Sequence, residues 1–178
     1  MKSKKYNILI FISALLLCLS SCGNPSLLIG DTASMGEARF KDITSAIEDK
    51  NTEDLKSLFS TNALKKVENF EGDAEYLFDF FQGNIISTKV ASAGSGSKNN
   101  GERTEEINYK YTVTTSKEKY IVFFTDVLVD TENPDNEGLY MLQIIKESDR
   151  KEQFDWGGDK TKCPGIYRPP ASTGSAIS

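Results

Sequence analysis

The chain has 178 residues, with 26 acidic and 21 basic side chains and a formal net charge of −5 at pH 7. This length suits one domain with its own core, and the acidic balance disfavours nucleic acid and anionic lipid headgroups as partners. The sequence contains no histidine, which excludes histidine-based nucleophilic catalysis and Cys–His zinc sites. We therefore predict no nucleic-acid partner, no cofactor, no metal site and no catalytic residues.

The first 22 residues have the features of an export signal. Three lysines precede an apolar run over residues 8–19, which is shorter than the roughly twenty residues of a membrane-spanning helix. The next motif, Leu19-Ser20-Ser21-Cys22, resembles a bacterial lipobox, in which the cysteine receives a diacylglyceryl group and becomes the new N-terminus. This resemblance implies a lipoprotein signal peptide over residues 1–21 and a mature protein held by membrane lipid through acylated Cys22, on the extracytoplasmic face of the cell membrane. The alternative is an ordinary secretory signal that leaves Cys22 as a free thiol.

Cleavage before Cys22 would change the charge and the cysteine content. It removes three of the 21 basic residues and none of the 26 acidic ones, leaving 18 against 26 and a formal charge of −8. Cys18 is also removed, so Cys163 has no partner for a disulfide within the chain. With no histidine or second cysteine to activate it, Cys163 is predicted to be a packed or weakly reactive thiol.

Three helical stretches are predicted in the first half of the chain. Residues 22–34 are rich in Gly, Pro, Ser and Asp without a period, which predicts a tether. A single domain follows over residues 35–168, and residues 169–178 are predicted to be a disordered tail. Apolar spacing predicts helices over residues 35–49, from a cap at Asn51 or Thr52 to about Asn69, and over residues 73–82. The last helix, capped by Glu71-Gly72-Asp73, is apolar on most sides and is predicted to form the hydrophobic centre.

After Gly83 the apolar period changes from helical to two, which predicts strands. We place them over residues 84–91, 104–115, 119–130 and 139–147, with a polar, mobile loop over residues 93–101. The third strand is apolar on both faces, as expected of a central strand or of one whose outer face meets a partner. The order predicts an α+β fold with N-terminal helices packed in a curved antiparallel sheet of at least four strands.

This order resembles the nuclear-transport-factor-2-like fold, also called ketosteroid-isomerase-like or cystatin-like, in which a curved sheet and its helices form a cone with an open mouth. Residues 46–60 are similar to the helix–turn–helix entry of that superfamily. Together with the lipobox and the Phe-rich helix, the motifs Glu137-Gly138-Leu139-Tyr140 and Gly165-Ile166-Tyr167 resemble a family of Gram-positive lipoproteins whose function is unassigned. The resemblance implies a fold and no chemistry.

Five residues are candidates for a pocket. Asp126 interrupts an apolar strand; if it faces an apolar cavity, its pKa should be raised and it could act as a general base. Tyr109, Tyr111 and Tyr140 are the candidate hydrogen-bond donors beside it. The alternative places Asp126 at a bulge or near the sheet rim, solvated or paired with a lysine. Trp156, flanked by glycine, either closes the cone mouth as a lid or packs into the core.

These observations lead to three hypotheses for the function. The leading one is a non-catalytic, lipid-anchored module that binds a small molecule, a peptide or an envelope protein. The second is a structural or assembly protein whose outer sheet face, including Phe123 and Val127, forms a homodimer or docks a partner. The third is an isomerase-like or dehydratase-like enzyme built on Asp126, which requires an apolar cavity around that carboxylate.

Overall fold

The computed structural model describes residues 27–99 and 102–169. Cys22, the predicted signal peptide and the predicted tail from residue 170 onward therefore lie outside the described residues. The chain divides into two compact units, residues 1–37 and 38–178. Helix α2 (Leu27–Glu48) contains the boundary between them. It begins at Leu27 rather than at Met35, so the last part of the predicted tether, residues 27–34, is helical. None of the helices in the described part of the chain has the length and the apolar run that a membrane span requires.

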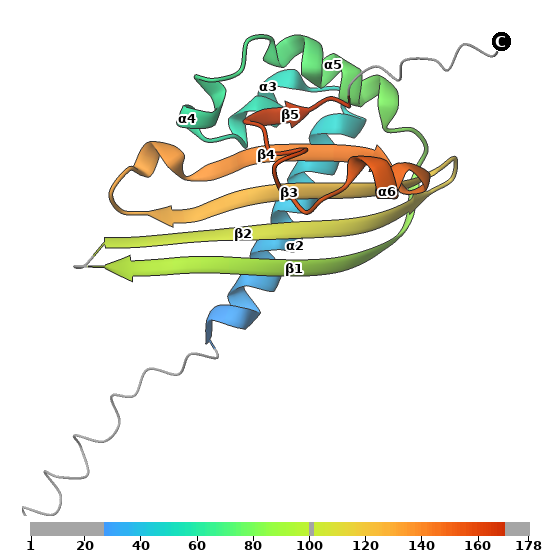
Figure 1. The fold of residues 1–178 in the computed structure, drawn as a ribbon. Helices are drawn as coiled ribbons and strands as arrows, with labels where there is room; N and C mark the ends of the chain where they lie inside the picture. Colours follow the sequence, from blue (N-terminus) through green and yellow to red (C-terminus); the bar gives the residue numbers. More distant parts are fainter. Residues whose placement is uncertain (1–26, 100–101, 170–178) are drawn as a thin grey trace, which may run out of the picture. The chain divides into compact units, whose positions relative to one another are not determined.

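The second unit is α+β, as predicted. Its helices are α3 (Thr52–Ser57), α4 (Thr61–Leu64), α5 (Phe70–Phe80), η1 (Pro134–Asn136), η2 (Glu147–Asp149) and α6 (Arg150–Gln153), and its strands are β1 (Ile85–Asn99), β2 (Glu102–Thr115), β3 (Lys119–Asp130), β4 (Gly138–Lys146) and β5 (Gly165–Tyr167). The strands form one sheet in the order β1-β2-β3-β4-β5 (Figure 1). The sheet is mixed rather than purely antiparallel, because β5 pairs with β4 in parallel.

Side-chain caps fix where the short helices begin. The Asn51 side chain accepts a hydrogen bond from the Asp54 N–H at 3.1 Å, which identifies Asn51 as the cap of α3. We predicted one helix from there to about residue 69, and this was wrong, because α4 is a single turn that ends at Leu64. The next helix, α5, is capped by Asn69 and not by Glu71-Gly72-Asp73, since the Asn69 side chain accepts from the Gly72 N–H at 3.2 Å.

The predicted loop at residues 93–101 is mostly strand. Strand β1 continues to Asn99, and its residues from Ala93 onward pair with β2 between Asn108 and Glu102. Glycine and serine have low strand propensity, but a long neighbouring strand supplies backbone hydrogen-bond partners that override it. Strand β1 is thereby an edge of the sheet along its whole length.

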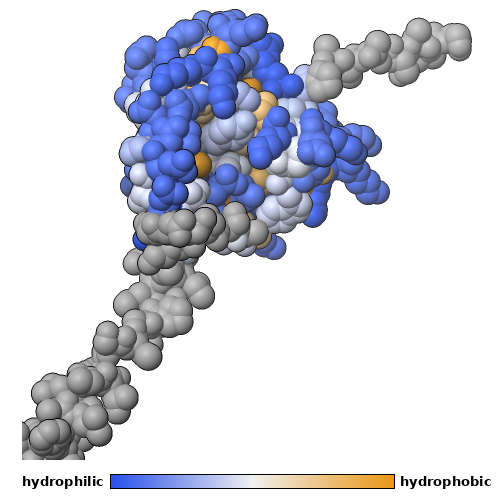
Figure 2. All heavy atoms as spheres, turned by 60° about the vertical axis from the view of Figure 1, so that its left-hand side comes forward, coloured by the Kyte–Doolittle hydropathy of each residue, from blue (hydrophilic) through white to orange (hydrophobic). Residues whose placement is uncertain are grey.

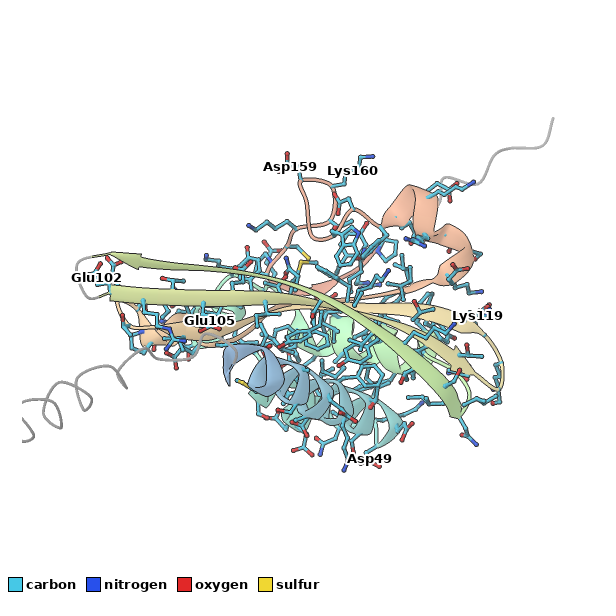
Figure 3. The ribbon with its side chains drawn as sticks, turned by 90° about the horizontal axis from the view of Figure 1, so that it is seen from below. Asp49, Glu102, Glu105, Lys119, Asp159 and Lys160 are labelled. Carbon is cyan, nitrogen blue, oxygen red and sulfur yellow. The ribbon has the colours of Figure 1, made fainter. Side chains whose placement is uncertain are left out.

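The sheet buries apolar side chains on two faces. We call the face that carries Tyr109, Tyr111 and Phe124 the inner face, and these residues share a core cluster with side chains of α2, α3 and α5. The opposite, outer face carries a smaller cluster of Ile121, Phe123, Met141 and Ile145. Figure 3 shows the two sides of the sheet, with Asp49 beyond one face and Asp159 and Lys160 of the C-terminal segment beyond the other. The apolar character of both faces of β3 is thus explained within the chain itself.

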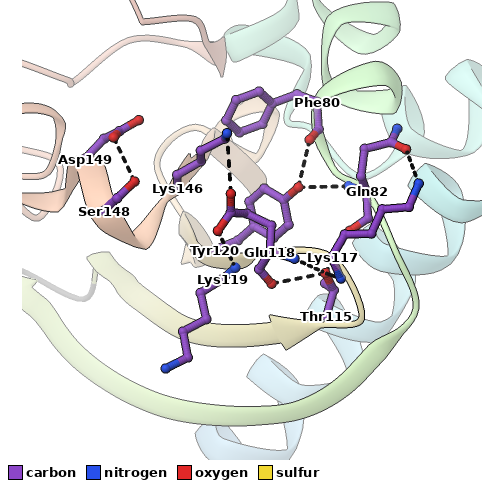
Figure 4. Close-up of polar contacts among 10 residues, drawn as sticks. All are labelled: Phe80, Gln82, Thr115, Lys117, Glu118, Lys119, Tyr120, Lys146, Ser148 and Asp149. Atoms are coloured by element: carbon purple, nitrogen blue, oxygen red, sulfur yellow. Dashed lines mark hydrogen bonds and ion pairs between the residues drawn. The ribbon is translucent and has the colours of Figure 1, made fainter.

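The C-terminal end of α5 is fixed to the end of β2 and the start of β3. The Tyr120 hydroxyl donates to the Phe80 carbonyl and accepts from the Gln82 N–H, both at 3.0 Å (Figure 4). The Thr115 hydroxyl donates to the Gln82 carbonyl at 2.8 Å. These bonds satisfy backbone groups that the end of a helix leaves unpaired. Helix α5 buries Ala74, Leu77 and Phe78, which agrees with its predicted central position.

Candidate functional site

Asp126 lies in an ion pair on the inner face. Its side chain is 3% exposed and Arg39 is 26% exposed, and the Arg39 Nε lies 2.9 Å from Asp126 Oδ2. A second guanidinium nitrogen lies 3.4 Å from Asp126 Oδ1, so Arg39 engages both carboxylate oxygens. The register between β3 and β4 shifts at Asp126. Asp126 therefore lies at a bulge, as in the alternative that we gave for it, but its partner is an arginine and not a lysine.

Two predicted tyrosines share the inner face with Asp126. Tyr111 is buried and stacks on Phe40, with ring centroids 4.1 Å apart. Tyr109 is buried as well, and burial, supplemented by the negative charge of Asp126, raises the pKa of its hydroxyl to about 12. Tyr109 therefore stays protonated at neutral pH. An arginine-bound carboxylate beside a protonated phenol is a stable charge arrangement rather than a free general base.

The five predicted pocket residues do not come together. Tyr109, Tyr111 and Asp126 lie on the inner face, whereas Tyr140 packs against the outer cluster. The reason is the bulge, because Thr125 pairs with Met141 and Asp126 pairs with Leu139, which leaves Tyr140 without an opposite partner. Trp156 also contacts the outer face, through Phe123. One pocket built from all five residues, as we expected, is thus not formed.

Trp156 is the most exposed aromatic residue on the outer face, with 41% of its surface accessible. Its ring lies 5.4 Å from that of Phe154 and meets Phe123 edge-on at 6.3 Å. The Lys110 ammonium lies 4.9 Å from the centre of the indole, in a cation–π contact. Phe123 itself is fully buried beneath these rings. A homodimer through Phe123 would need surface that the chain already covers.

The backbone at Trp156 is held in an unusual conformation. Trp156 has a φ of +61° and Gly157 a φ of +72°, and a bulky residue in this region costs about 1–3 kcal/mol. The turn is held by Asp155, whose carboxylate accepts from the Gly158 N–H at 3.1 Å, from the Lys160 N–H at 2.9 Å and from the Thr161 hydroxyl. Burial alone would raise the pKa of Asp155, but these hydrogen bonds lower it.

An open groove of about 780 Å³ runs beside Trp156. Its lining comes from η2, from α6 and from the segment after α6, and consists of Glu147, Ser148, Arg150, Lys151, Glu152, Phe154 and Trp156. We did not single out the α6 residues from the sequence. The signal that could have found them is the charged run after the last long strand, followed by a lone tryptophan before two glycines.

A second, smaller cavity of about 210 Å³ lies near Tyr140, where α4 and η1 meet the sheet. Its lining residues are Ser60, Asn62, Ala63, Lys66, Thr104, Glu106, Val127, Asp130, Asn136 and Tyr140. Apart from Tyr140, sequence reasoning did not propose them as pocket residues. They come from segments far apart in the chain, and no local spacing connects them.

The family model described as Domain of unknown function (DUF5104) matches residues 42–147, more than half of the chain. The chain belongs to this family. No curated protein matches it. Every residue that lines the Tyr140 cavity falls inside the DUF5104 segment, whereas Trp156 and Arg39 lie outside it.

Cys163 is half-buried and free. Burial, with a smaller effect of the Asp73 charge, raises the pKa of its thiol from 9.0 to about 11, so at pH 8 the thiolate fraction falls about a hundredfold. We expect iodoacetamide at pH 8 to alkylate Cys163 about a hundredfold more slowly in the native protein than in denaturant, measured by mass spectrometry over time. Native alkylation should accelerate with each pH unit up to about 11. Equal native and denatured rates at pH 8 would contradict this.

Proposed function

We propose that the protein is a non-catalytic binding module, anchored through acylated Cys22 on the extracytoplasmic face of the cell membrane, that recognises a peptide or an envelope protein with the groove around Trp156. The observation that carries this proposal is Trp156 itself, which is both exposed and held at a φ of +61°. Strained backbone persists where the surrounding structure enforces it and concentrates at ligand-binding positions. Tryptophan is also among the residues that contribute most binding energy at interfaces.

The lining of the groove favours a peptide or protein over a small apolar molecule. Arg150 and Lys151 supply positive charge, Glu147 and Glu152 supply negative charge, and Trp156 with Phe154 supplies apolar area. Small-molecule sites are more often enclosed and mainly apolar. An aromatic anchor with a charged rim is the usual composition of a protein interface. The contacts of Asp155, Phe123 and Lys110 would keep Trp156 in its binding conformation before a ligand arrives, which reduces the entropic cost of binding.

A non-catalytic role is supported by the state of Asp126, the one acidic residue that we considered as a general base. Both of its oxygens are engaged by Arg39, so a substrate would have to displace the guanidinium before proton transfer. We also propose that the second unit has the cone of the nuclear-transport-factor-2-like fold. The order of helices followed by four antiparallel strands, and a core cluster with side chains from both, support this assignment.

The proposal is tested by native mass spectrometry of the protein isolated from the membranes of its own host. We expect the wild-type protein to retain a peptide or protein adduct that the Trp156→Ala variant loses. Ile86→Ala is the matched control, because Ile86 is an apolar side chain with 68% exposure that lies on β1, outside the groove. Because Trp156 is the only tryptophan, adding the isolated adduct back should also shift the intrinsic emission. An adduct retained equally by both variants, or absent from the wild type, would contradict the proposal.

A further inference from the structure

The Tyr140 cavity brings together side chains of opposite charge. Lys66 lies just beyond α4, Glu106 is on β2, and both line the same 210 Å³ space. Thr104 and Glu106 place the cavity near the start of β2, on the side of the molecule that Figure 2 brings forward. The surface there is mainly hydrophilic, with a smaller pale and hydrophobic area among the charged side chains. Tyr140 and Val127 contribute apolar surface to the cavity.

Lys66 and Glu106 are left without partners, whereas their neighbours are paired. Within residues 27–99 and 102–169, neither side chain has a hydrogen bond or an ion pair within 4.0 Å. The adjacent Lys65 pairs with Asp135 at 3.1 Å. Asp130, which also lines the cavity, accepts hydrogen bonds from the Asn133 N–H at 3.0 Å and the Asn136 amide at 2.8 Å. One cation and one anion therefore remain available to a bound molecule.

We propose that the Tyr140 cavity binds a small zwitterion of the amino-acid class. Lys66 would pair with the carboxylate and Glu106 with the ammonium group, both in charge-assisted hydrogen bonds. The ring of Tyr140 and the side chain of Val127 would contact the apolar part of the ligand. A volume of 210 Å³ is below the range of drug-sized pockets but exceeds the roughly 30 Å³ of one water molecule several times over. This site shares no lining residue with the Trp156 groove, so it is independent of the proposed function.

The ligand class is tested by calorimetric titration of the full chain with L-alanine, ethylamine and propionate. Ethylamine lacks the carboxylate of alanine, and propionate lacks its ammonium group, so each probe removes one of the two predicted ion pairs. We expect L-alanine to bind at least about tenfold more tightly than either analogue. Equal binding of ethylamine would indicate a cation site, and equal binding of propionate an anion site; either result overturns the proposal. L-alanine that fails to bind at about 10 mM also overturns it.

Matched variants test the residue assignment. Glu106→Gln and Lys66→Met should each weaken L-alanine binding at least about tenfold. The controls are Glu105→Gln and Lys65→Met, whose parent residues are adjacent in sequence, already paired with Arg103 and Asp135, and outside the cavity lining. They should leave the affinity unchanged, as should Trp156→Ala, which separates this site from the groove. If all four charge variants bind L-alanine alike while unfolding at the wild-type temperature, the assignment is wrong.

Discussion

Replacing Arg39 with methionine is expected to lower the free energy of unfolding by about 3 kcal/mol, because it leaves the Asp126 carboxylate buried without its counter-ion. Methionine keeps the apolar stem of arginine but lacks the guanidinium group, so the loss reports mainly on charge. We expect a loss of stability at the lower end of what removing one partner of a buried ion pair costs, because the Arg39 side chain is 26% exposed and solvent partly screens its charge. Chemical denaturation followed by circular dichroism measures it.

Two further variants isolate the ion pair. Combining Arg39→Met with Asp126→Leu removes both charges, and the double variant should be more stable than Arg39→Met alone. Lys50→Met is the surface control, because Lys50 pairs with Asp79 at 3.7 Å with both side chains well exposed, and its loss should cost less than about 1 kcal/mol. If Arg39→Met costs no more than Lys50→Met, Asp126 does not depend on its arginine.

Replacing Cys22 with alanine is expected to move nearly all of the protein from the membrane fraction to the soluble fraction or the medium. Two acyl chains anchor a protein stably, since each buried methylene contributes about 0.8 kcal/mol. A polypeptide without acyl chains lacks this binding energy. The formal charge of −8 predicted for the mature protein offers no electrostatic attraction to anionic lipid that could replace them. Cell fractionation with immunoblotting measures the distribution.

The control is Cys163→Ala, which removes the other cysteine of the mature chain and should leave the protein in the membrane fraction. Mass spectrometry of the wild-type protein should show residues 22–178 with the added mass of a diacylglyceryl group. An unmodified Cys22 at the mature N-terminus, or a Cys22→Ala variant that stays in the membrane although residues 1–21 have been removed, would rule out lipid anchoring.

The parts of the fold that follow from local pattern were predicted from the sequence. The alternation of Tyr109 and Tyr111 with polar residues identified the buried side of β2. One of the two predicted cap residues, Asn51, is the one that caps α3. Residues 93–99 were assigned to a loop because their composition is poor for a strand, yet β2 pairs with them along their length. Pairing with a distant segment is a tertiary effect that no local pattern contains.

The candidate site was predicted less completely, and for the same reason. Asp126 stood out in the sequence because it interrupts an apolar strand, but its partner Arg39 lies 87 residues away in sequence, and no pattern near either residue links them. The bulge that moves Tyr140 to the outer face depends on how β3 and β4 align. Lys66 and Glu106 became candidates only when the fold placed them around one cavity.

The parallel pairing of β5 with β4 has a consequence for the order in which the chain folds. Phe123 and Met141 belong to the central strands. The residues that pack against their cluster, Phe154 and Tyr167, are synthesised later, near the end of the chain. Until those residues have emerged, the outer face of β3 and β4 presents apolar side chains to its surroundings, which makes a nascent or shortened chain prone to aggregate. If the chain is exported as we propose, crossing the membrane unfolded would make the outer face and the C-terminal segment that covers it available at the same time.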